Sequence, residues 1–468
     1  MTWDASVVTT LDDRRLDGLT NDTVELLQTL IRNRCVNDGT EASGEEVRNA
    51  DVLQQVIAGP GVDVERYEAA PGRVSIVGRI PGSDPDAPSL CLMGHTDVVP
   101  VNASGWSEDP FGGEIIDGPD GPEVWGRGAV DMLNLTASMA VTFRSLADSG
   151  FRPTGDLIYF GVADEEAGSA YGARWMADHH RDTIMADYVL TESGGLHSGP
   201  AEAPFVGVNI AEKGVAWRRL RVRGTPGHGS APFRRDNALV KAAGVIQRLH
   251  DYRPAPRFHE LWGHKVEALG LPDDLKAALL DPGAIDGVLD TLPSAASSHF
   301  HACTHTTFSP NLVDGNESGG GRMKVNVIPD TVVIEVDIRT LPGEGPDEVE
   351  AHLRAALGDL ADEVEVEPLM NDVATISRLD TPLWDSLERA VNVPFPTARL
   401  SPQFVVGFTD ARIYREMGAV AYGAGLFSPS LDASEYGSRF HGNNERIDIE
   451  SLALTTRLFH HVATDLLA

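Results

Sequence analysis

Between residues 73 and 191 the sequence alternates short apolar runs with longer segments of helical periodicity. The apolar runs have the length of buried strands: RVSIVGRI, SLCLMG, DLIYFGVA and ADYVLT, at residues 73–80, 89–94, 156–163 and 186–191. Helices are predicted at 135–150 and 169–181, and a first helix is predicted to begin at Asp22 or Thr23. Buried strands that alternate with helices are typical of a mostly parallel sheet covered on both faces. We therefore predict an α/β fold whose mostly parallel sheet is sandwiched by helices.

After about residue 210 the pattern changes to that of a separate α+β unit. VAWRRLRVRG (215–224) alternates as an antiparallel strand does, and MKVNVIPDTVVIEVDIRTL (323–341) predicts two strands joined by a turn at Pro329-Asp330. From about residue 372 the chain returns to elements of the first kind. Because 468 residues are too many for one typical core, we predict that one domain is inserted into another. The outer domain would comprise residues 1–211 and 372–468, and the inserted domain residues 212–371.

The charge and the cysteines restrict the classes of partner. A net charge of −32 disfavours nucleic acid and anionic membranes, because both require a basic surface. The 3 cysteines, Cys35, Cys91 and Cys303, are far apart and form no CxxC pair, which indicates neither a disulfide framework nor a thiolate zinc site. No apolar run approaches the ~20 residues of a membrane span, and the N-terminal stretch lacks the features of a signal peptide. We expect a cytoplasmic protein.

Ionisable side chains follow the predicted strands at the points where the strands end. They are His95 and Asp97 after the second strand, Asp164, Glu165 and Glu166 after the third, and Glu192 after the fourth. Asp131 stands between them, at a predicted helix start. In open α/β sheets, ligands bind at the carboxyl ends of the strands. Carboxylates gathered there repel one another unless a cation lies among them. Imidazole and carboxylate ligands without thiolates suit Zn²⁺, with Co²⁺ and Mn²⁺ as weaker candidates.

Each of these features also has a simpler explanation when it is taken alone. A run such as Asp-Glu-Glu is usually a solvated face or a helix start, where acidic residues are favoured. An acidic, salt-adapted surface without any metal is therefore an alternative. If a metal is present, the adjacent Glu165 and Glu166 cannot point the same way, so we expect one to bind metal and the other to accept a proton. Asp97 is placed to orient the His95 ring.

The motifs MGHTDVVP, WGRGAVDMLN, DEEAGS, TESGG and SRFHGNNE resemble, in order and spacing, one metallopeptidase family. It includes aminoacylase, acetylornithine deacetylase, succinyl-diaminopimelate desuccinylase, carnosine dipeptidase and glutamate carboxypeptidase, and the similarity extends from about residue 25 to the C-terminus. The resemblance implies two zinc ions per chain. Their ligands would be His95 and Glu192 for one ion, Glu166 and His441 for the other, and Asp131 as the bridge. It also implies that Glu165 is the general base, that Asp97 steers His95, and that the Asp131–Met132 peptide is cis. The two histidines should then lie on opposite sides of Asp131.

The inserted domain shares further residues with the family. His228, in GTPGHGSAP, resembles the histidine that the family's dimers place in the partner's active site to stabilise the oxyanion. Asn326 and Arg339 resemble substrate-binding residues, and Arg339 would bind a substrate carboxylate bidentately. The segments 407–414 and 421–425 resemble pocket-lining segments. These similarities imply a homodimer in which the inserted domain acts as lid and dimerisation domain.

Two segments depart from the family pattern. RNRCVNDGTEASGEE (32–46) stands where the family often has Pro-Ser or Pro-Thr. The stretch 255–320 is long and contains His299, His301 and His305, which could form a separate metal cluster. We favour the interpretation that this stretch is a variable part of the lid, and it leaves the choice of substrate open.

The sequence as a whole predicts a metal-dependent hydrolase. It would cleave the amide bond of N-acyl amino acids or of short peptides with a free carboxylate, using a zinc-activated water and Glu165 as the general base. A dipeptidase or carboxypeptidase of the same family is an alternative. A catalytically silent relative that only binds ligands is another, although none of the expected ligands is missing.

Overall fold

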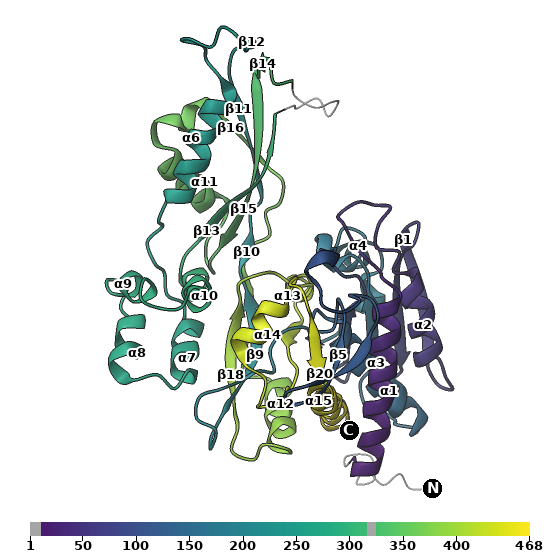
Figure 1. The fold of residues 1–468 in the computed structure, drawn as a ribbon. Coiled ribbons are helices and arrows are strands. Elements are labelled where there is room, and N and C mark those ends of the chain that lie inside the picture. Colours follow the sequence, from purple (N-terminus) through teal and green to yellow (C-terminus); the bar gives the residue numbers. More distant parts are fainter. Residues whose placement is uncertain (1–10, 316–323) are drawn as a thin grey trace.

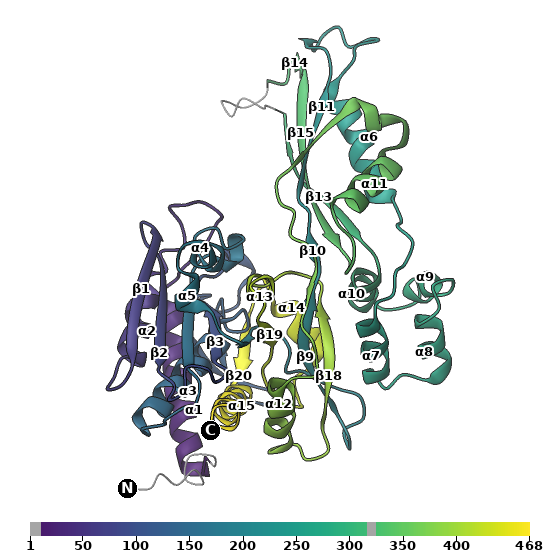
Figure 2. The same ribbon diagram turned by 180° about the vertical axis from the view of Figure 1, so that it is seen from behind.

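The computed structural model describes residues 11–315 and 324–468 of the chain. Residues 1–10 and 316–323 lie outside this description. They include the start of the N-terminal stretch in which no signal peptide is predicted, and the end of the 255–320 segment. A large unit holds both ends of the described chain, and a smaller unit projects from it (Figures 1 and 2). Within the described residues, no helix is long and apolar enough to cross a membrane.

A 10-stranded sheet forms the centre of the large unit, in the order β1-β2-β6-β3-β7-β19-β9-β17, with β8 and β18 paired to β9. The inner strands β6, β3, β7 and β19 are all parallel, which confirms the predicted mostly parallel sheet. The strands are β1 (Asp63–Ala70), β2 (Arg73–Ile80), β3 (Leu90–His95), β6 (Leu157–Val162), β7 (Tyr188–Thr191), β8 (His197–Ser198), β9 (Phe205–Glu212), β17 (Thr375–Ile376), β18 (Arg399–Val405) and β19 (Val420–Gly423).

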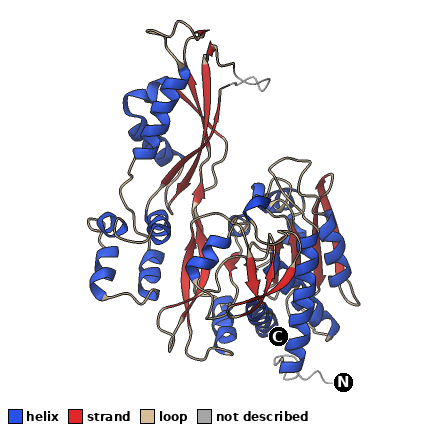
Figure 3. Cartoon of the chain, viewed as in Figure 1, coloured by secondary structure: helices blue, strands red, loops and turns tan. Residues whose placement is uncertain are grey.

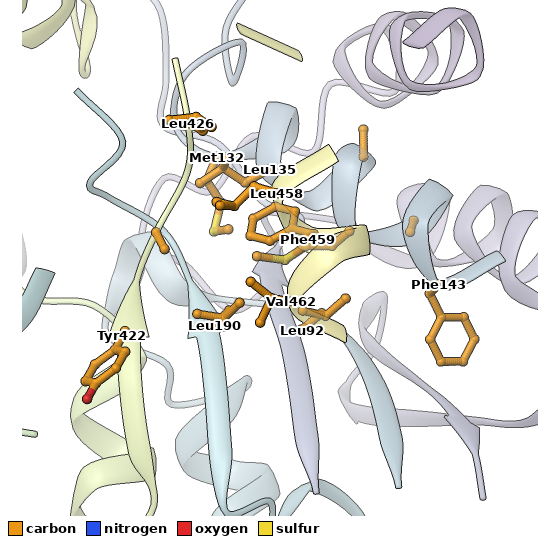
Figure 4. Packing of buried hydrophobic residues seen from close by; sticks show 14 of the residues in the cluster. Leu92, Met132, Leu135, Phe143, Leu190, Tyr422, Leu426, Leu458, Phe459 and Val462 are labelled. Atoms are coloured by element: carbon orange, nitrogen blue, oxygen red, sulfur yellow. The ribbon is translucent and has the colours of Figure 1, made fainter. Parts of the chain in front are cut away.

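Helices cover both faces of this sheet (Figure 3). Leu90 and Leu92 of β3 pack into one core and Cys91 and Met93 into the other, because successive strand residues point to opposite faces. Figure 4 shows the first core, where Phe459 and Val462 lie over the strands that carry Leu92 and Leu190. The helices of this face are α1 (Asp13–Arg32), α2 (Val47–Ile57), α3 (Leu133–Asp148), α12 (Pro382–Asn392) and α15 (Ile449–Leu466). The other face carries α4 (Ala173–His179), α5 (Arg181–Ile184) and α13 (Ala411–Glu416).

A small three-stranded sheet and several short elements complete the large unit. The sheet has the order β20-β5-β4 and connects the C-terminal region to the loop before α3. Its strands are β4 (Glu114–Gly118), β5 (Gly121–Trp125) and β20 (Arg446–Asp448). The short helical elements are η2 (Ala103–Gly105), η3 (Glu165–Ala167) and α14 (Ala433–Arg439).

The projecting unit is an antiparallel sheet with two helices on one face. β15 lies between β13 on one side and β10 and β11 on the other, and β16 pairs with β11. Apolar residues of α6 and α11 pack against this sheet, whereas the opposite face carries ion pairs such as Arg219–Glu335 at 2.6 Å. The elements are β10 (Gly214–Val215), β11 (Arg218–Arg223), β13 (Thr307–Asp314), β15 (Thr331–Thr340), β16 (Val364–Pro368), α6 (Ala238–Asp251), α11 (Pro346–Leu357) and η4 (Gly358–Glu363). A separate ribbon of β12 (Gly227–His228) and β14 (Val327–Ile328) lies at the far end (Figure 1).

A group of four helices between α6 and β13 lies beside the large unit. They are α7 (Glu260–Ala268), α8 (Asp273–Leu279), α9 (Ile285–Leu289) and α10 (Ser294–Thr304). Trp262 is buried in their common core, which Val406 joins from the end of β18. The rings of His259 and Phe404 lie 4.6 Å apart. Much of the stretch 255–320 therefore packs on the edge of the main sheet.

The first helix begins earlier than the sequence predicted. α1 starts at Asp13, where the side chain of Asp12 accepts a hydrogen bond from the Arg15 N–H. Thr23 lies within the helix instead of capping it, and its hydroxyl donates to the carbonyl of Leu19, one turn before it. The prediction was wrong because the Thr23 hydroxyl makes its hydrogen bond inside the helix. A threonine can therefore stand in the interior of a helix although the residue type favours capping positions.

Candidate metal centre

Two groups of possible metal ligands meet at the carboxyl ends of the parallel strands, and they share Asp131. One group is His95, Asp131 and Glu192, and the other is Asp131, Glu166 and His441. Within each group the ligand atoms all lie within 4.8 Å of one another. In the described ranges 11–315 and 324–468, no further group of three His, Cys, Asp or Glu side chains converges in this way.

The two histidines flank the shared carboxylate, as expected from the sequence. Nε2 of His95 lies 3.2 Å from Oδ1 of Asp131, and Nε2 of His441 lies 3.2 Å from Oδ2. Oε2 of Glu166 lies 3.1 Å from His441 Nε2, and Oε2 of Glu192 lies 4.0 Å from His95 Nε2. Each imidazole therefore points its Nε2 into a pocket of carboxylate oxygens.

Local backbone geometry brings these side chains together. His95 is the last residue of β3, and Glu165 and Glu166 form the η3 turn directly after β6. Asp164 begins that turn with a φ of +65°, a left-handed conformation that Asp tolerates better than most residues. Asp131 precedes α3, and its peptide bond to Met132 is cis, which confirms the expectation from the family resemblance.

Glu445 ties the Asp131 loop to the segment that carries His441. Its carboxylate accepts hydrogen bonds from the backbone N–H groups of Val130 at 2.8 Å and Asp131 at 3.1 Å. It also forms a buried ion pair with Arg127 at 2.6 Å. The sequence analysis did not identify Glu445, although it lies within the quoted motif SRFHGNNE.

The cluster concentrates negative charge in a buried place. Asp131, Glu165 and Glu192 are each less than one tenth exposed. Burial raises the pKa of Glu165 and Glu192 well above the ordinary glutamate value, and the charge of Glu192 adds to the effect at Glu165. Hydrogen bonds to Asp131 and Glu166 raise the pKa of His441 to about 10. Oε1 of Glu166 is buried without a hydrogen-bond partner among the described residues. Divalent cations would neutralise this charge and engage the unpaired oxygen, so the donor set fits a pair of zinc ions.

Asp97 holds both the imidazole of His95 and the η3 turn that carries Glu165 and Glu166, hereafter the glutamate turn. Its backbone carbonyl lies 3.0 Å from Nδ1 of His95, which must donate to it, so Nε2 remains free as a ligand atom. Its carboxylate accepts from the backbone N–H groups of Glu165 at 3.3 Å and Glu166 at 3.2 Å. The carboxylate lies farther from the ring, with Oδ1 3.6 Å from Nδ1. Asp97 thus fixes His95 relative to the two glutamates.

A buried polar network continues from Asp97 into the large unit. Nδ2 of Asn37 donates to Asp97 Oδ2 at 2.9 Å and to Asp164 Oδ1 at 3.0 Å. Arg73 pairs with Asp164 at 2.6 Å and with Glu46 at 2.8 Å. The sequence analysis did not identify Asn37, Arg73 or Glu46; the only signal was that Asn37 and Glu46 fall in the segment that departs from the family pattern.

His228 and Asn326 do not approach the cluster within this chain. Both are exposed and belong to the β12–β14 ribbon, where Gly229 N–H donates to the Asn326 carbonyl at 2.8 Å. Nδ1 of His228 lies 2.7 Å from the hydroxyl of Ser230. Figures 1 and 2 place this ribbon at the end of the projecting unit farthest from the large unit.

Arg339 lies at the junction of the two units, close to the glutamate turn. Its guanidinium is 5.0 Å from the ring centroid of Phe408, and the guanidinium of Arg412 is 4.5 Å from the same centroid. Arg412 in turn donates to the Gly168 carbonyl at 3.3 Å. Gly168 is the residue after η3, so only two side chains separate Arg339 from the turn that carries Glu165 and Glu166.

The three histidines of the 255–320 stretch take part in the packing of α10. The rings of His301 and His305 are stacked at 4.1 Å, and Nε2 of His305 lies 3.2 Å from Asp286. Burial lowers the pKa of His299 to about 3 and that of His301 to about 4. The ammonium of Lys213 donates to the carbonyls of Ala302 and His305 at the end of this helix. The alternative of a second metal cluster here has no geometric support.

Comparisons with known proteins agree with this geometry. The sequence model of the family described as "Peptidase family M20/M25/M40" matches residues 91–465. The chain is 25% identical to the probable carboxypeptidase S-like 2 of Dictyostelium discoideum, over 83% of this chain and 73% of the relative. It is 28% identical to aminoacylase-1 of Sus scrofa, over 79% and 78%. It is 27% identical to the N-fatty-acyl-amino acid synthase/hydrolase PM20D1 of Xenopus tropicalis, over 83% and 74%.

Solved structures share the fold over nearly the whole chain. Human carnosine dipeptidase 1 superimposes with a TM-score of 0.68 at 17% identity, covering 99% of this chain and 98% of the other. The dipeptidase Dug1p of Saccharomyces cerevisiae gives a TM-score of 0.69 at 16% identity, covering 100% and 99%. At these identities the similarity concerns the fold.

Proposed function

Because this chain belongs to peptidase family M20/M25/M40, we propose that it is a zinc-dependent amidohydrolase of the aminoacylase or carboxypeptidase type. Its substrates would be N-acyl amino acids or short peptides that carry a free carboxylate. The observation that carries the proposal is the pair of ligand groups that share Asp131. The family match and the hydrolases among the relatives support the general conclusion that the chain is a metallohydrolase.

We infer two metal ions per chain from the composition of the two groups. His95 and Glu192 would hold one ion, Glu166 and His441 the other, with Asp131 as the shared ligand. Two imidazoles and carboxylate oxygens without thiolates favour zinc, and Co²⁺ or Mn²⁺ could replace it. When bound, such a metal pair polarises the scissile carbonyl and makes water a stronger acid.

Glu165 is our candidate for the general base. It is buried at the start of η3, beside the ligand Glu166, and Asp97 holds the backbone N–H groups of both residues. In this proposal the Glu165 carboxylate accepts a proton from the attacking water and then donates it to the nitrogen of the departing amine. Asp97 and Asn37 keep that carboxylate at a fixed distance from the metal ligands.

The free carboxylate of the substrate would bind Arg339. This guanidinium lies at the junction of the units, and Nη1 is buried without a hydrogen-bond partner among the described residues. The names of the relatives, aminoacylase, carboxypeptidase and N-fatty-acyl-amino acid hydrolase, all refer to amino-acid or peptide chemistry. An α-carboxylate is the group that such substrates share.

We also propose a homodimer in which His228 stabilises the oxyanion in the partner's active site. The position of His228 and Asn326 at the far end of the projecting unit supports this, because neither can contribute to the cluster of its own chain in this arrangement. Exposed apolar residues stand near them in the sequence: Val325 and Val327 flank Asn326, and Phe233 follows His228 by five residues. Residues 212–371 would then serve as lid and dimerisation domain, and residues 1–211 and 372–468 as the catalytic domain. The buried and unpaired cysteines fit a cytoplasmic location.

A screen of the metal-reconstituted protein tests the proposal. The purified chain is loaded with Zn²⁺, Co²⁺ or Mn²⁺ and assayed against panels of N-acyl amino acids, dipeptides and longer peptides. Preference for N-acyl amino acids supports the aminoacylase type, and preference for peptides supports the dipeptidase or carboxypeptidase alternative. Two bound metals without turnover of any substrate would favour the silent relative. Less than one metal per chain without activity would favour the salt-adapted surface.

A further inference from the structure

Arg339 is held from two sides, and the neighbours that hold it suggest how it selects its ligand. We propose that Asp337 and Phe408 are positioning residues that orient Arg339 so that one edge of its guanidinium faces the substrate's carboxylate. The inference rests on the proposed function and names two residues on which carboxylate specificity depends. Asp337 lies two residues before Arg339 on β15, and Phe408 comes from the large unit after β18.

Asp337 occupies one edge of the guanidinium and leaves another edge free. Nε of Arg339 donates to Asp337 Oδ1 at 2.7 Å, and Nη2 donates to Oδ2 at 3.2 Å. A guanidinium carries N–H groups on three nitrogens, so Nη1 and the second hydrogen of Nη2 remain. Nη1 is buried and makes no hydrogen bond to any described residue. The remaining Nη1–Nη2 edge has the geometry that binds a second carboxylate through two parallel hydrogen bonds.

Asp337 is itself fixed by an aromatic side chain. Nε1 of Trp217 donates to Asp337 Oδ1 at 2.9 Å, so this oxygen accepts from both Trp217 and Arg339. Trp217 directly precedes β11, next to the crossing between the two units. Its ring packs edge-on against Phe408, with centroids 6.4 Å apart. The Asp337 carboxylate therefore has little freedom to rotate, and its two hydrogen bonds to Arg339 restrict the orientation of the guanidinium in turn.

Phe408 covers one face of the guanidinium and links it to the glutamate turn. The ring contacts two cations, with the Arg339 guanidinium 5.0 Å and the Arg412 guanidinium 4.5 Å from its centroid. Arg412 is buried and pairs with Asp372 at 3.0 Å. Since Arg412 also donates to the Gly168 carbonyl, the position of Arg339 is fixed relative to Glu165 and Glu166. A substrate must span this separation, which favours a carboxylate at a set distance from the bond that is cleaved.

A second ion pair on the same strand provides the control. Glu335 stands two residues before Asp337, on the same face of β15, and pairs with Arg219 at 2.6 Å. The two acidic side chains have similar exposed fractions, 31% for Glu335 and 28% for Asp337. No aromatic ring lies over the Arg219 guanidinium among the described residues, and Glu335 is farther than Asp337 from the end of β15 that pairs with β10. Loss of this pair should therefore reproduce any general effect on the sheet without touching Arg339.

The test compares carboxylate and carboxamide ligands. Wild type, Asp337→Asn, Phe408→Leu and Glu335→Gln are assayed with N-acetyl amino acids and their matched carboxamides. The same three substitutions are placed in zinc-loaded Glu165→Gln protein, and calorimetry gives the affinities for both ligands without turnover. We expect Asp337→Asn to weaken the carboxylate ligand about tenfold or more, mainly in KM, because it removes a charge-assisted contact that orients Arg339. Phe408→Leu should weaken it about two- to fivefold. Glu335→Gln should behave as wild type, and the carboxamide should not respond to any substitution.

Each result has one meaning. A loss of the carboxylate preference in Asp337→Asn, but not in Glu335→Gln, supports the proposal. An unchanged preference, or an equal loss for carboxylate and carboxamide, would show that Asp337 does not act through Arg339 and would overturn it. If the protein hydrolyses nothing but binds the carboxylate selectively, and Asp337→Asn removes this selectivity, the hydrolase function is refuted and the positioning role is still supported. Wild-type protein without any carboxylate preference would refute the positioning role.

Discussion

His95 and His441 contact the two oxygen atoms of one carboxylate, Asp131, each at 3.2 Å. One histidine ends a strand in the first quarter of the chain, and the other follows a short helix near the C-terminus. Their meeting point makes Asp131 the residue on which both proposed metal positions depend.

Asp131→Asn should therefore remove both metal ions. The amide keeps the shape of the side chain but replaces one ligand oxygen with a nitrogen that cannot bind a cation. We expect less than one ion per chain by elemental analysis and a loss of hydrolysis greater than about 100-fold, the upper end of the cost of losing an outer partner of a ligand. Asp148→Asn, at an exposed ion pair with Arg144, is the control. Two retained ions in Asp131→Asn would contradict the bridging role.

The substitutions Glu165→Gln and Glu166→Gln should have different effects on metal content and on kcat. Glu165→Gln is expected to keep both metals and to lose turnover by about 10²–10⁴-fold, because it removes only the group that transfers the proton. Glu166→Gln is expected to lose metal, since Glu166 contacts His441. Metal content and kcat are measured on both variants. Normal turnover in Glu165→Gln would exclude it as the general base.

Asn37 should matter for the rate although it touches no proposed ligand. Its amide holds Asp97 and Asp164 at 2.9 and 3.0 Å. We expect Asn37→Ala to reduce kcat by about 10–100-fold with most of the metal retained. Asn37→Asp should be more damaging, since it adds a charge beside two carboxylates. The order of the two kcat values is the decisive observation. Wild-type kcat in both variants would remove Asn37 from the positioning network.

The transfer of His228 between subunits can be tested by mixing two inactive variants. His228→Ala should lower activity by about 10²–10³-fold, as does the loss of other oxyanion donors. When it is unfolded and refolded together with Glu165→Gln, half of the dimers carry one complete site. The mixture should recover roughly a quarter of wild-type activity. Activity that stays at the level of the separate variants would show that His228 does not act across the dimer.

We expect His460 to lower the free energy of unfolding in mild acid. It is 1% exposed on α15, and burial, together with the charges of Arg15 and His461, lowers its pKa to about 4. The unfolded chain then binds the proton more readily between pH 4 and 6.5. Stability from this residue is complete above pH 6.5 and falls by roughly 3 kcal/mol as the pH drops to 4. His460→Leu should flatten the free energy of unfolding over that range, measured by urea titration. Exposed His250→Leu is the control, and an identical slope in both variants would refute the assignment.

The sequence predicted those parts of the fold and site that local patterns encode. β3, β6 and β7 are short apolar runs, and His95, Glu165 and Glu192 were found because each follows such a run directly. The fold class followed from the same alternation. Asn37, Arg73 and Glu445 were missed as functional residues, because their partners lie in remote segments of the chain and no local pattern links them. The position of α7–α10 on the edge of the main sheet depends on tertiary packing and could not be predicted either.

The interruption of the large unit has a consequence for how the chain is made. The strands and helices of the small sheet all come from residues 214–368, so this unit can fold as soon as that length has been synthesised. The outer unit needs α15, which packs against α1, α3 and α12, and His441. It therefore cannot close until α15 has emerged from the ribosome. While residues 369–466 are being synthesised, the nascent chain can hold a folded insert between two parts of an unfinished outer unit. The metal centre, which needs His441, forms only after the insert.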